Sequence, residues 1–242
     1  MSGDGRRTPS TAPVERERLS RSLIIDAAIG QVDRDGVSAL SMRRLGKQLG
    51  VEAMSLYRYV NGREDLLEGI VDELVGELEV APEKGLGASN GWQAYIQWLA
   101  HEVRSMALAH PAAFPLVATR HPAAPWLRPP LRSLRIVEQF LNALIDRGFT
   151  GEQAVDAYRT FTSFLLGHLL LETATLGAET GPASEPLDEG NADVPNRDED
   201  VELADYPTLL RLRPLLSQDD TEAEFERALE ALLDRLDMSL SQ

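Results

Sequence analysis

The sequence has 242 residues, a formal net charge of −15 at pH 7 and no cysteine, which excludes disulfides and thiolate metal sites. Its longest strongly apolar run, residues 164–171, is far shorter than the roughly 20 residues that a membrane span needs. Residues 1–13 lack the apolar core of a signal peptide, so we expect a cytoplasmic protein. Residues 1–63 carry a net charge of +4 and residues 64–242 a net charge of −19, so only the N-terminal end suits a polyanion.

The first elements of the chain are predicted as a disordered segment followed by three helices. Residues 1–18 are polar with scattered arginines, which is typical of disorder. Apolar residues at helical spacing predict a helix over residues 19–36. A second short helix follows Ser41, whose hydroxyl is placed to cap it, and a third spans about residues 52–60. Gly50 stands between these two helices, where a tight turn needs a residue that tolerates positive φ.

A fourth helix and a boundary come next. Asn61 is expected to begin this helix, with Glu64 three residues later completing a capping box. Residues 66–78 form a broad apolar face along it. Pro82 and the Gly-rich residues 85–91 then indicate a domain boundary.

The rest of the chain shows no strand alternation and is predicted to be helical. One helix covers residues 92–109 and another covers residues 131–147. Between them, residues 111–130 contain six prolines, so only short helical turns fit there. We therefore expect an all-α protein.

A long helix and a terminal helix are predicted to form a subunit interface. The helix over residues 152–176 is apolar on nearly every side from 161 to 171, so it must be covered on every side. Residues 179–205 hold ten acidic side chains and one basic one, which predicts a flexible acidic loop. The amphipathic helix over residues 222–236 is expected to join the long helix in a four-helix interface between two subunits. The interface side chains chosen as probes are Leu165 and Leu232.

Residues 41–60 follow the order of a helix-turn-helix, in which one short helix braces a second that enters the major groove. Over residues 40–67 the sequence LSMRRLGKQLGVEAMSLYRYVNGREDLL closely resembles the DNA-binding signature of the tetracycline-repressor (TetR) family. The matching segments are Ser41-Met42-Arg43, Gly50-Val51, Leu56-Tyr57-Arg58-Tyr59-Val60 and Arg63 to Leu67.

The resemblance implies a two-domain, all-helical regulator. Its helix-turn-helix domain of three helices would span residues 19–66, and a connecting helix residues 67–84. A larger helical domain for ligand binding and dimerisation would span residues 92–242. The family implies a homodimer that binds palindromic operator DNA and leaves it when a small-molecule effector binds. No membrane partner is implied.

The resemblance also implies DNA contacts for individual residues. Arg43 stands where a base contact is expected, and its guanidinium fits guanine O6 and N7. Ala53 and Met54 would offer apolar contact to thymine methyl groups, and Arg58 a polar contact. Met42 and Arg44 belong to the same set, although the spacing of Met42 also fits the buried stripe and Arg44 would serve the phosphate backbone. Phosphate contacts are implied for Ser41, Ser55, Tyr57, Tyr59 and Arg63.

The ligand site is expected where the aromatic residues of the second domain gather, although core packing also explains most of them. In tetracycline repressors a histidine after the central helix holds drug-bound magnesium, but residues 112–120 offer Val117 and no histidine. The four histidines of the chain lack metal-ligand spacing, so neither a metal nor a cofactor is expected. The expected ligand-binding residues are Tyr95, Trp98, Glu102, Phe114, Val117, Trp126, Phe140, Phe161, Phe164 and His168.

Two other functions remain as alternatives. An all-helical enzyme is one, but the sequence offers no nucleophile–base pairing, phosphate-binding loop or metal-ligand cluster to support it. The other is an effector-independent protein of chromosome architecture or protein interaction. Binding to one palindromic site favours the regulator, whereas equal binding to unrelated sequences favours the architectural protein.

Overall fold

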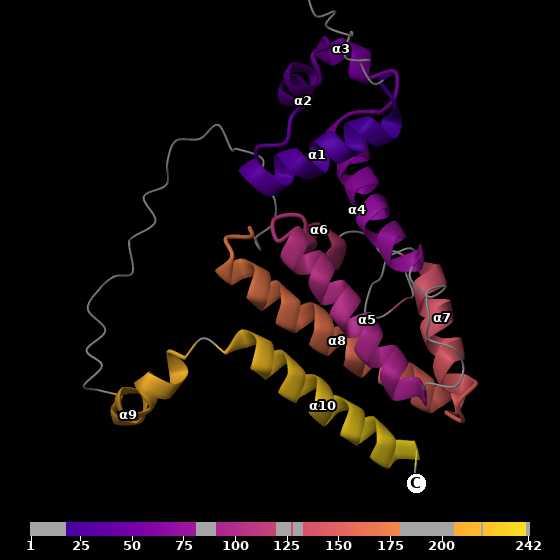
Figure 1. Ribbon diagram of the computed structural model, residues 1–242, viewed down its shortest axis with the longest axis vertical. Coiled ribbons are helices and arrows are strands. Elements are labelled where there is room, and N and C mark those ends of the chain that lie inside the picture. Colours follow the sequence, from indigo (N-terminus) through magenta and orange to yellow (C-terminus); the bar gives the residue numbers. More distant parts are fainter. Residues whose placement is uncertain are drawn as a thin grey trace, which may run out of the picture.

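The computed structural model describes residues 18–80, 91–119, 127, 133–179, 206–218 and 220–240. Within these ranges all regular structure is helical, in ten helices (Figure 1). The all-α prediction is therefore confirmed for the described residues. The expected disorder of residues 1–18 and the expected acidic loop at 179–205 lie almost entirely outside them.

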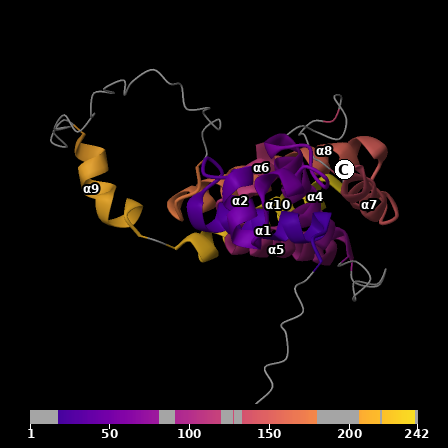
Figure 2. The same cartoon turned by 90° about the horizontal axis from the view of Figure 1, so that it is seen from above.

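Three helices form one end of the molecule, namely α1 (Arg21–Asp35), α2 (Met42–Leu49) and α3 (Ala53–Leu56) (Figure 1). The backbone N–H of Leu23 donates to the Ser20 hydroxyl at the start of α1, and Gly36 ends that helix with φ of 81°. Leu45 of α2 and Leu56 of α3 are fully buried against α1. From above, α1 and α2 lie over the core helices (Figure 2).

Helix α4 (Arg63–Val80) leads from this end into the core, packing against α1, α5 (Gly91–Ala109) and α6 (Phe114–Thr119). Its start differs from the prediction of a capping box between Asn61 and Glu64. The side chain that reaches back is Asp65, whose Oδ2 accepts a 2.7 Å hydrogen bond from the Asn61 backbone N–H. The capping-box assignment was therefore wrong by one residue.

The core is a layered bundle in which α7 (Leu134–Ile145) and α5 pack on the long helix α8 (Gly151–Thr175). Thr150 and Gln153 exchange side-chain and backbone hydrogen bonds, a capping box that fixes the start of α8. The helix α10 (Thr221–Leu240) covers another side of α8 (Figure 1).

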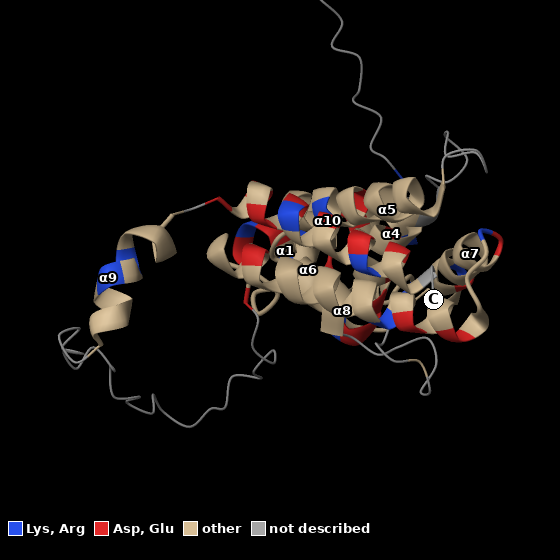
Figure 3. Ribbon diagram, turned by 90° about the horizontal axis from the view of Figure 1, so that it is seen from below, with Lys and Arg blue, Asp and Glu red and all other residues tan. Residues whose placement is uncertain are grey.

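Helix α9 (Pro207–Leu216) stands apart from the bundle (Figure 1). None of its residues is buried, although it carries several leucines. At the end of the molecule opposite α1–α3, acidic side chains outnumber basic ones along α8 and α10 (Figure 3). The charge asymmetry of the sequence is thus also an asymmetry in space.

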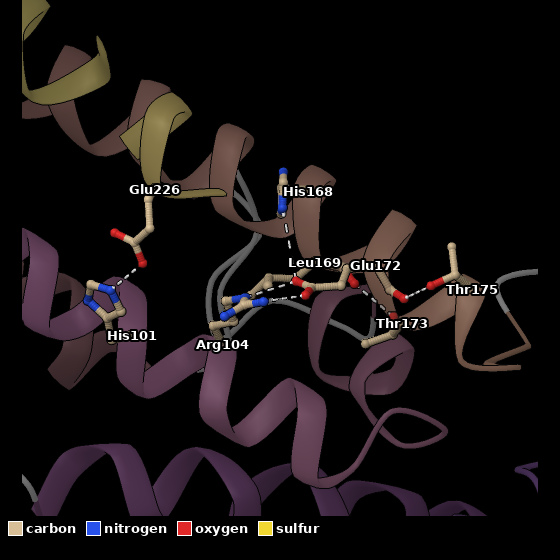
Figure 4. A network of polar contacts seen from close by, with 8 residues as sticks. All are labelled: His101, Arg104, His168, Leu169, Glu172, Thr173, Thr175 and Glu226. Atoms are coloured by element: carbon tan, nitrogen blue, oxygen red, sulfur yellow. Dashed lines mark hydrogen bonds and ion pairs between the residues drawn. The ribbon is translucent and has the colours of Figure 1, made fainter. Parts of the chain in front are cut away.

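A buried ion pair joins α5 to α8 (Figure 4). The Arg104 guanidinium donates to Glu172 over 2.6 Å and 3.1 Å, and these side chains are only 16% and 7% exposed. The hydrogen bonds to Glu172 raise the pKa of Arg104, so the guanidinium stays protonated. The same guanidinium lies 5.1 Å from the ring centre of Phe225, which brings α10 into the cluster.

Leu165 and Leu232 were expected at the interface between two subunits, and both expectations were wrong. Leu165 and Leu232 are 4% and 8% exposed within their own chain, so they belong to the subunit core. The outward side of α8 carries Ser163, Gly167 and Leu171 instead. Helical spacing grouped residues onto faces correctly, but it did not show which face the chain itself covers.

Candidate nucleic-acid interface and ligand cavity

The turn between α2 and α3 is set by two glycines. Gly50 ends α2 in the left-handed conformation, with φ of 67° and ψ of 31°. A Cβ atom on Gly46 would lie 2.9 Å from the Val51 carbonyl oxygen, so only glycine lets α2 approach the turn this closely. Helix α3 ends at Leu56, earlier than the predicted residue 60, although the Val60 N–H still donates to the Leu56 carbonyl.

The segment from α2 through the end of α3 presents exposed side chains of the kind that bind DNA. Met54, Tyr57 and Tyr59 are 76%, 48% and 40% exposed, so their side chains face solvent. Arg43 and Arg58 are exposed beside them in the chain. Because the motif holds these five side chains outward, they are available to base edges and phosphates.

Ser41 caps α2 and keeps its hydroxyl hydrogen available as a donor. Its Oγ accepts a 3.3 Å hydrogen bond from the Arg44 N–H and thereby caps α2. The hydroxyl hydrogen is still available to donate to a phosphate oxygen. Ala53 and Ser55 are half-buried on α3.

Three side chains of the predicted DNA-binding set are engaged with the protein. Met42 is half-buried and packs against the core. The Nη2 atom of Arg63 donates to the Val37 carbonyl over 3.0 Å, so part of this guanidinium braces the loop before α2. Arg44 lies 3.6 Å from a carboxylate oxygen of Asp35, in an exposed pair.

A clamp that the sequence motif does not reveal holds the end of the recognition segment. Arg21 at the start of α1 donates to both carboxylate oxygens of Asp65 and to the Tyr59 carbonyl, the last over 3.2 Å. The hydrogen bonds that Asp65 accepts from Arg21 and, second, from the Asn61 backbone N–H lower its pKa. The clamp joins residues 44 positions apart, so no local pattern predicts it.

Two polar contacts connect α1 and its following loop to the core. The Nδ1 atom of His110, just after α5, lies 2.9 Å from Oδ2 of Asp33. Ser38 donates to Glu179, just after α8, over 3.0 Å. Since both pairs are distant in sequence, only the folded chain brings them together.

An apolar cavity of about 60 Å³ lies where α4, α5, α6, α7 and α8 meet. Among its described lining residues none is charged, and the hydroxyl groups belong to Ser133, Tyr158 and Thr162. Burial raises the pKa of Tyr158 to about 12, and this side chain shares a hydrogen bond with Thr162. The lining residues are Val75, Leu78, Leu99, Val103, Met106, Val117, Ser133, Ile136, Val137, Phe140, Tyr158, Phe161, Thr162, Leu165 and Leu166.

Three of the ten expected ligand residues line this cavity, namely Val117, Phe140 and Phe161. Glu102 is exposed on α5, and Phe114 is fully buried in the core. Trp126 lies outside the described residues. The remaining members of the set, Tyr95, Trp98, Phe164 and His168, are half-buried and do not line the cavity.

His168 belongs to the polar cluster between α8 and α10 and not to the cavity. Its Nε2 atom is buried without a hydrogen-bond partner, 4.0 Å from a Glu172 oxygen (Figure 4). Its ring centre lies 5.3 Å from that of Phe225. His168, expected as a polar group that orients a ligand, instead packs between helices.

The described residues contain no group of three acidic or histidine side chains arranged to hold a metal ion. Over the same ranges, no helix has the length and hydropathy to cross a membrane.

Comparison with known families matches nearly the whole chain. The family model described as bacterial regulatory proteins, tetR family, matches residues 24–70. The model described as the tetracyclin repressor-like C-terminal domain matches residues 82–239. The first match ends at residue 70 and the second begins at Pro82, so the second match includes the Gly-rich residues 85–91.

Individual relatives of this chain are transcriptional repressors. The HTH-type transcriptional repressor DrrR1 of Streptomyces coeruleorubidus is 27% identical, over 99% of this chain and 84% of its own length. The class A tetracycline repressor of transposon 1721 from Escherichia coli is 26% identical, over 90% and 91%.

Solved structures similar to this chain include TetR family proteins. The crystal structure of a possible TetR family regulator from Streptomyces coelicolor A3(2) has a TM-score of 0.70 at 30% identity, over 91% of this chain and all of that one. ActR of Streptomyces coelicolor in complex with actinorhodin has a TM-score of 0.65 at 23% identity, over 93% and 100%. At the latter identity the likeness concerns the fold.

Proposed function

The chain belongs to the TetR family of bacterial transcription regulators, and from this premise we propose that it is a homodimeric repressor of palindromic operator DNA, released by a small apolar effector. The observation that carries the proposal is the exposure of Met54, Tyr57 and Tyr59 at the basic end of an otherwise acidic protein. The expected division of the chain supports it, with residues 19–66 as the DNA-binding unit and residues 92–242 as the effector and dimerisation unit.

On the DNA side, we assign base contacts to Arg43, Met54 and Arg58, and phosphate contacts to Tyr57 and Tyr59. These five side chains are exposed, whereas the apolar side chains that brace them are buried. Arginine pairs with guanine through two hydrogen bonds, and a thymine methyl offers an apolar partner for methionine. Arg63 contributes through its remaining N–H groups, because one nitrogen is held by Val37.

The dimer proposal rests on the outward side of α8. Thr160, Ser163, Gly167 and Leu171 are exposed at spacings of three and four, and they form an uncharged stripe along the helix. Nothing lies within 4 Å of a Cβ atom built on Gly167. Glycine inside a helix costs about 1 kcal/mol relative to alanine, and no contact with the described part of the chain requires it here. A partner helix that approaches closely at this point supplies the reason.

Two further features support burial between two copies. Leu171, the last residue of the apolar segment 161–171, is 75% exposed. The leucines of α9, such as Leu215 at 63% exposure, have no cover within the described chain. Exposed apolar groups gathered in this way are typical of protein interfaces.

The central cavity supports an uncharged effector. A carboxylate or a metal chelate would lose its hydration there and meet no charged partner among the described lining residues. Val117 occupies the stretch where tetracycline repressors carry a magnesium-binding histidine, so we do not assign tetracycline–magnesium as the effector. Because Val75 and Leu78 of α4 line the cavity, a ligand that displaces them would move the helix that carries the DNA-binding end.

The proposal is tested by selecting the duplexes that the protein binds from a random library. The affinity of the protein for the selected duplex is then measured by fluorescence anisotropy. We expect a palindrome whose half-sites lie about 34–36 Å apart or a multiple of this distance. A screen of uncharged apolar compounds for release of that duplex then identifies the effector class. Equal affinity for selected and scrambled duplexes would instead favour the architectural alternative.

A further inference from the structure

The central cavity is too small for an effector of ordinary size. Its volume of about 60 Å³ holds only a few water molecules, each of which needs roughly 10–15 Å³ of such space. Pockets that hold drug-sized ligands measure roughly 300–1,000 Å³. A ligand that enters this cavity therefore extends beyond it.

A second hollow adjoins the cavity between α7 and α8. This groove has a volume of about 310 Å³ and opens to the surface. Its walls are largely apolar, with Leu134 and Leu141 on α7 and Val155 on α8. Val137 and Tyr158 line both the groove and the central cavity, so these two side chains form the partition between them.

We propose that the cavity and the α7–α8 groove are two compartments of one effector site, occupied by an elongated, mainly apolar molecule that carries no carboxylate, phosphate or sulfonate. This inference rests on the proposed function as a ligand-responsive regulator. Together the two compartments reach the volume range of known ligand pockets.

The partition consists of side chains, so it opens without unfolding a helix. Val137 and Tyr158 are 6% and 4% exposed. The Tyr158 ring packs edge-on against Phe140, with centres 5.9 Å apart, and its hydroxyl pairs with Thr162. Rotation of the Tyr158 side chain exchanges these contacts for contacts with a ligand that runs through the gap.

The charges at the groove mouth select against an anionic ligand. Glu138 and Arg159 stand at its rim, and the adjoining surface hollow adds Glu152 and Asp156. Arg159 already faces Asp156, with their charged atoms 3.9 Å apart. Among the described residues that line the two hollows, three carboxylates against one guanidinium leave a negative rim, which repels an acidic head group.

The experiment measures binding of two dyes by isothermal titration calorimetry to the full-length protein. N-phenyl-1-naphthylamine is neutral, and 8-anilinonaphthalene-1-sulfonate has the same ring system with a sulfonate. Val155→Trp and Leu141→Trp fill the groove from its opposite walls. Ile145→Trp is the matched control, because Ile145 is 47% exposed on α7 and lines neither compartment.

We expect each groove-filling variant to weaken binding of the neutral dye at least tenfold, and the control to stay within twofold of wild type. The sulfonated dye should bind wild type at least tenfold more weakly than the neutral one. If both groove variants keep the wild-type affinity for the neutral dye and Val117→Phe loses it, the ligand occupies the cavity alone. That result overturns this inference and leaves the proposed function intact. Absence of neutral-dye binding to wild type, or equal affinity for both dyes, also overturns it.

Discussion

The DNA-binding end and the core differ in where their functional side chains lie. At the DNA-binding end, Arg43, Met54 and Tyr57 come from fewer than twenty consecutive residues and point into solvent. In the core, the cavity walls come from five helices between Val75 and Leu166, and most are buried. A surface site is built by a local motif, whereas an internal site is built by packing, so the two regions should respond differently to substitution.

The largest effect is expected at the proposed dimer interface on α8. Gly167→Glu should give a folded monomer, because none of the described residues crowds this position. Loss of the second half-site should then weaken operator binding by roughly 10²–10⁴-fold. Sedimentation and anisotropy measure the two changes, with Ser105→Glu on the exposed surface of α5 as control. A variant that stays dimeric would move the interface away from α8.

The buried ion pair of the core should matter more than an exposed one. Glu172→Ala leaves the Arg104 charge unpaired at 16% exposure and should destabilise the fold by about 3–5 kcal/mol. Glu226→Ala, which breaks the exposed pair with His101, should cost less than about 1 kcal/mol. Urea unfolding of both variants makes the comparison. Equal small losses would mean that burial adds nothing to the core pair.

At the DNA-binding end, substitutions should change affinity with little change in stability. Arg43→Ala should cost roughly 1–3 kcal/mol on the selected operator and relax preference at one base pair per half-site. Tyr57→Phe should weaken binding to all sequences alike, because phosphates carry no sequence information. Titrations against operator and scrambled duplexes at several salt concentrations distinguish them. Equal losses for Arg43→Ala on both duplexes would make it a backbone anchor.

The Arg21–Asp65 clamp tests whether a substitution at the DNA-binding end can lower DNA affinity with little loss of stability. Asp65→Asn should change stability by less than about 1 kcal/mol, because Arg21 is 46% exposed, yet weaken operator binding severalfold by loosening Tyr59. Since Arg21 lowers the pKa of Asp65, the clamp's contribution is present above the ordinary carboxyl pKa and is lost as pH falls through the lowered value. Asp26→Asn, exposed on α1, is the control for both measurements.

The smallest effect concerns two tyrosines of the core. Burial raises the pKa of Tyr95 and of Tyr158 to about 12. An unfolded tyrosine ionises near 10, so the unfolded chain releases these protons first and stability falls as pH rises above about 10. Absorbance at 295 nm should show a late ionisation step that shrinks in Tyr158→Phe. Complete ionisation near pH 10 in the folded protein would contradict the burial of both rings.

The sequence was most informative where local hydrogen bonds decide the structure. Ser41 was predicted as the cap of α2 and Gly50 as its turn residue, and both are found there. Each interaction joins residues within five positions, so the pattern of residue types contains the whole of it. The exposed members of the DNA-binding set follow from the same motif.

The tertiary structure alone decided which partners face each side chain. Periodicity marked Leu165 and His168 as members of an apolar helix, but it did not show that Leu165 lines the cavity while His168 packs beside Phe225. Likewise, the choice of Asp65 over Glu64 at the start of α4 depends on Arg21, far away in the chain. Helical spacing assigns residues to a face, whereas the neighbour opposite that face is set by how distant helices pack.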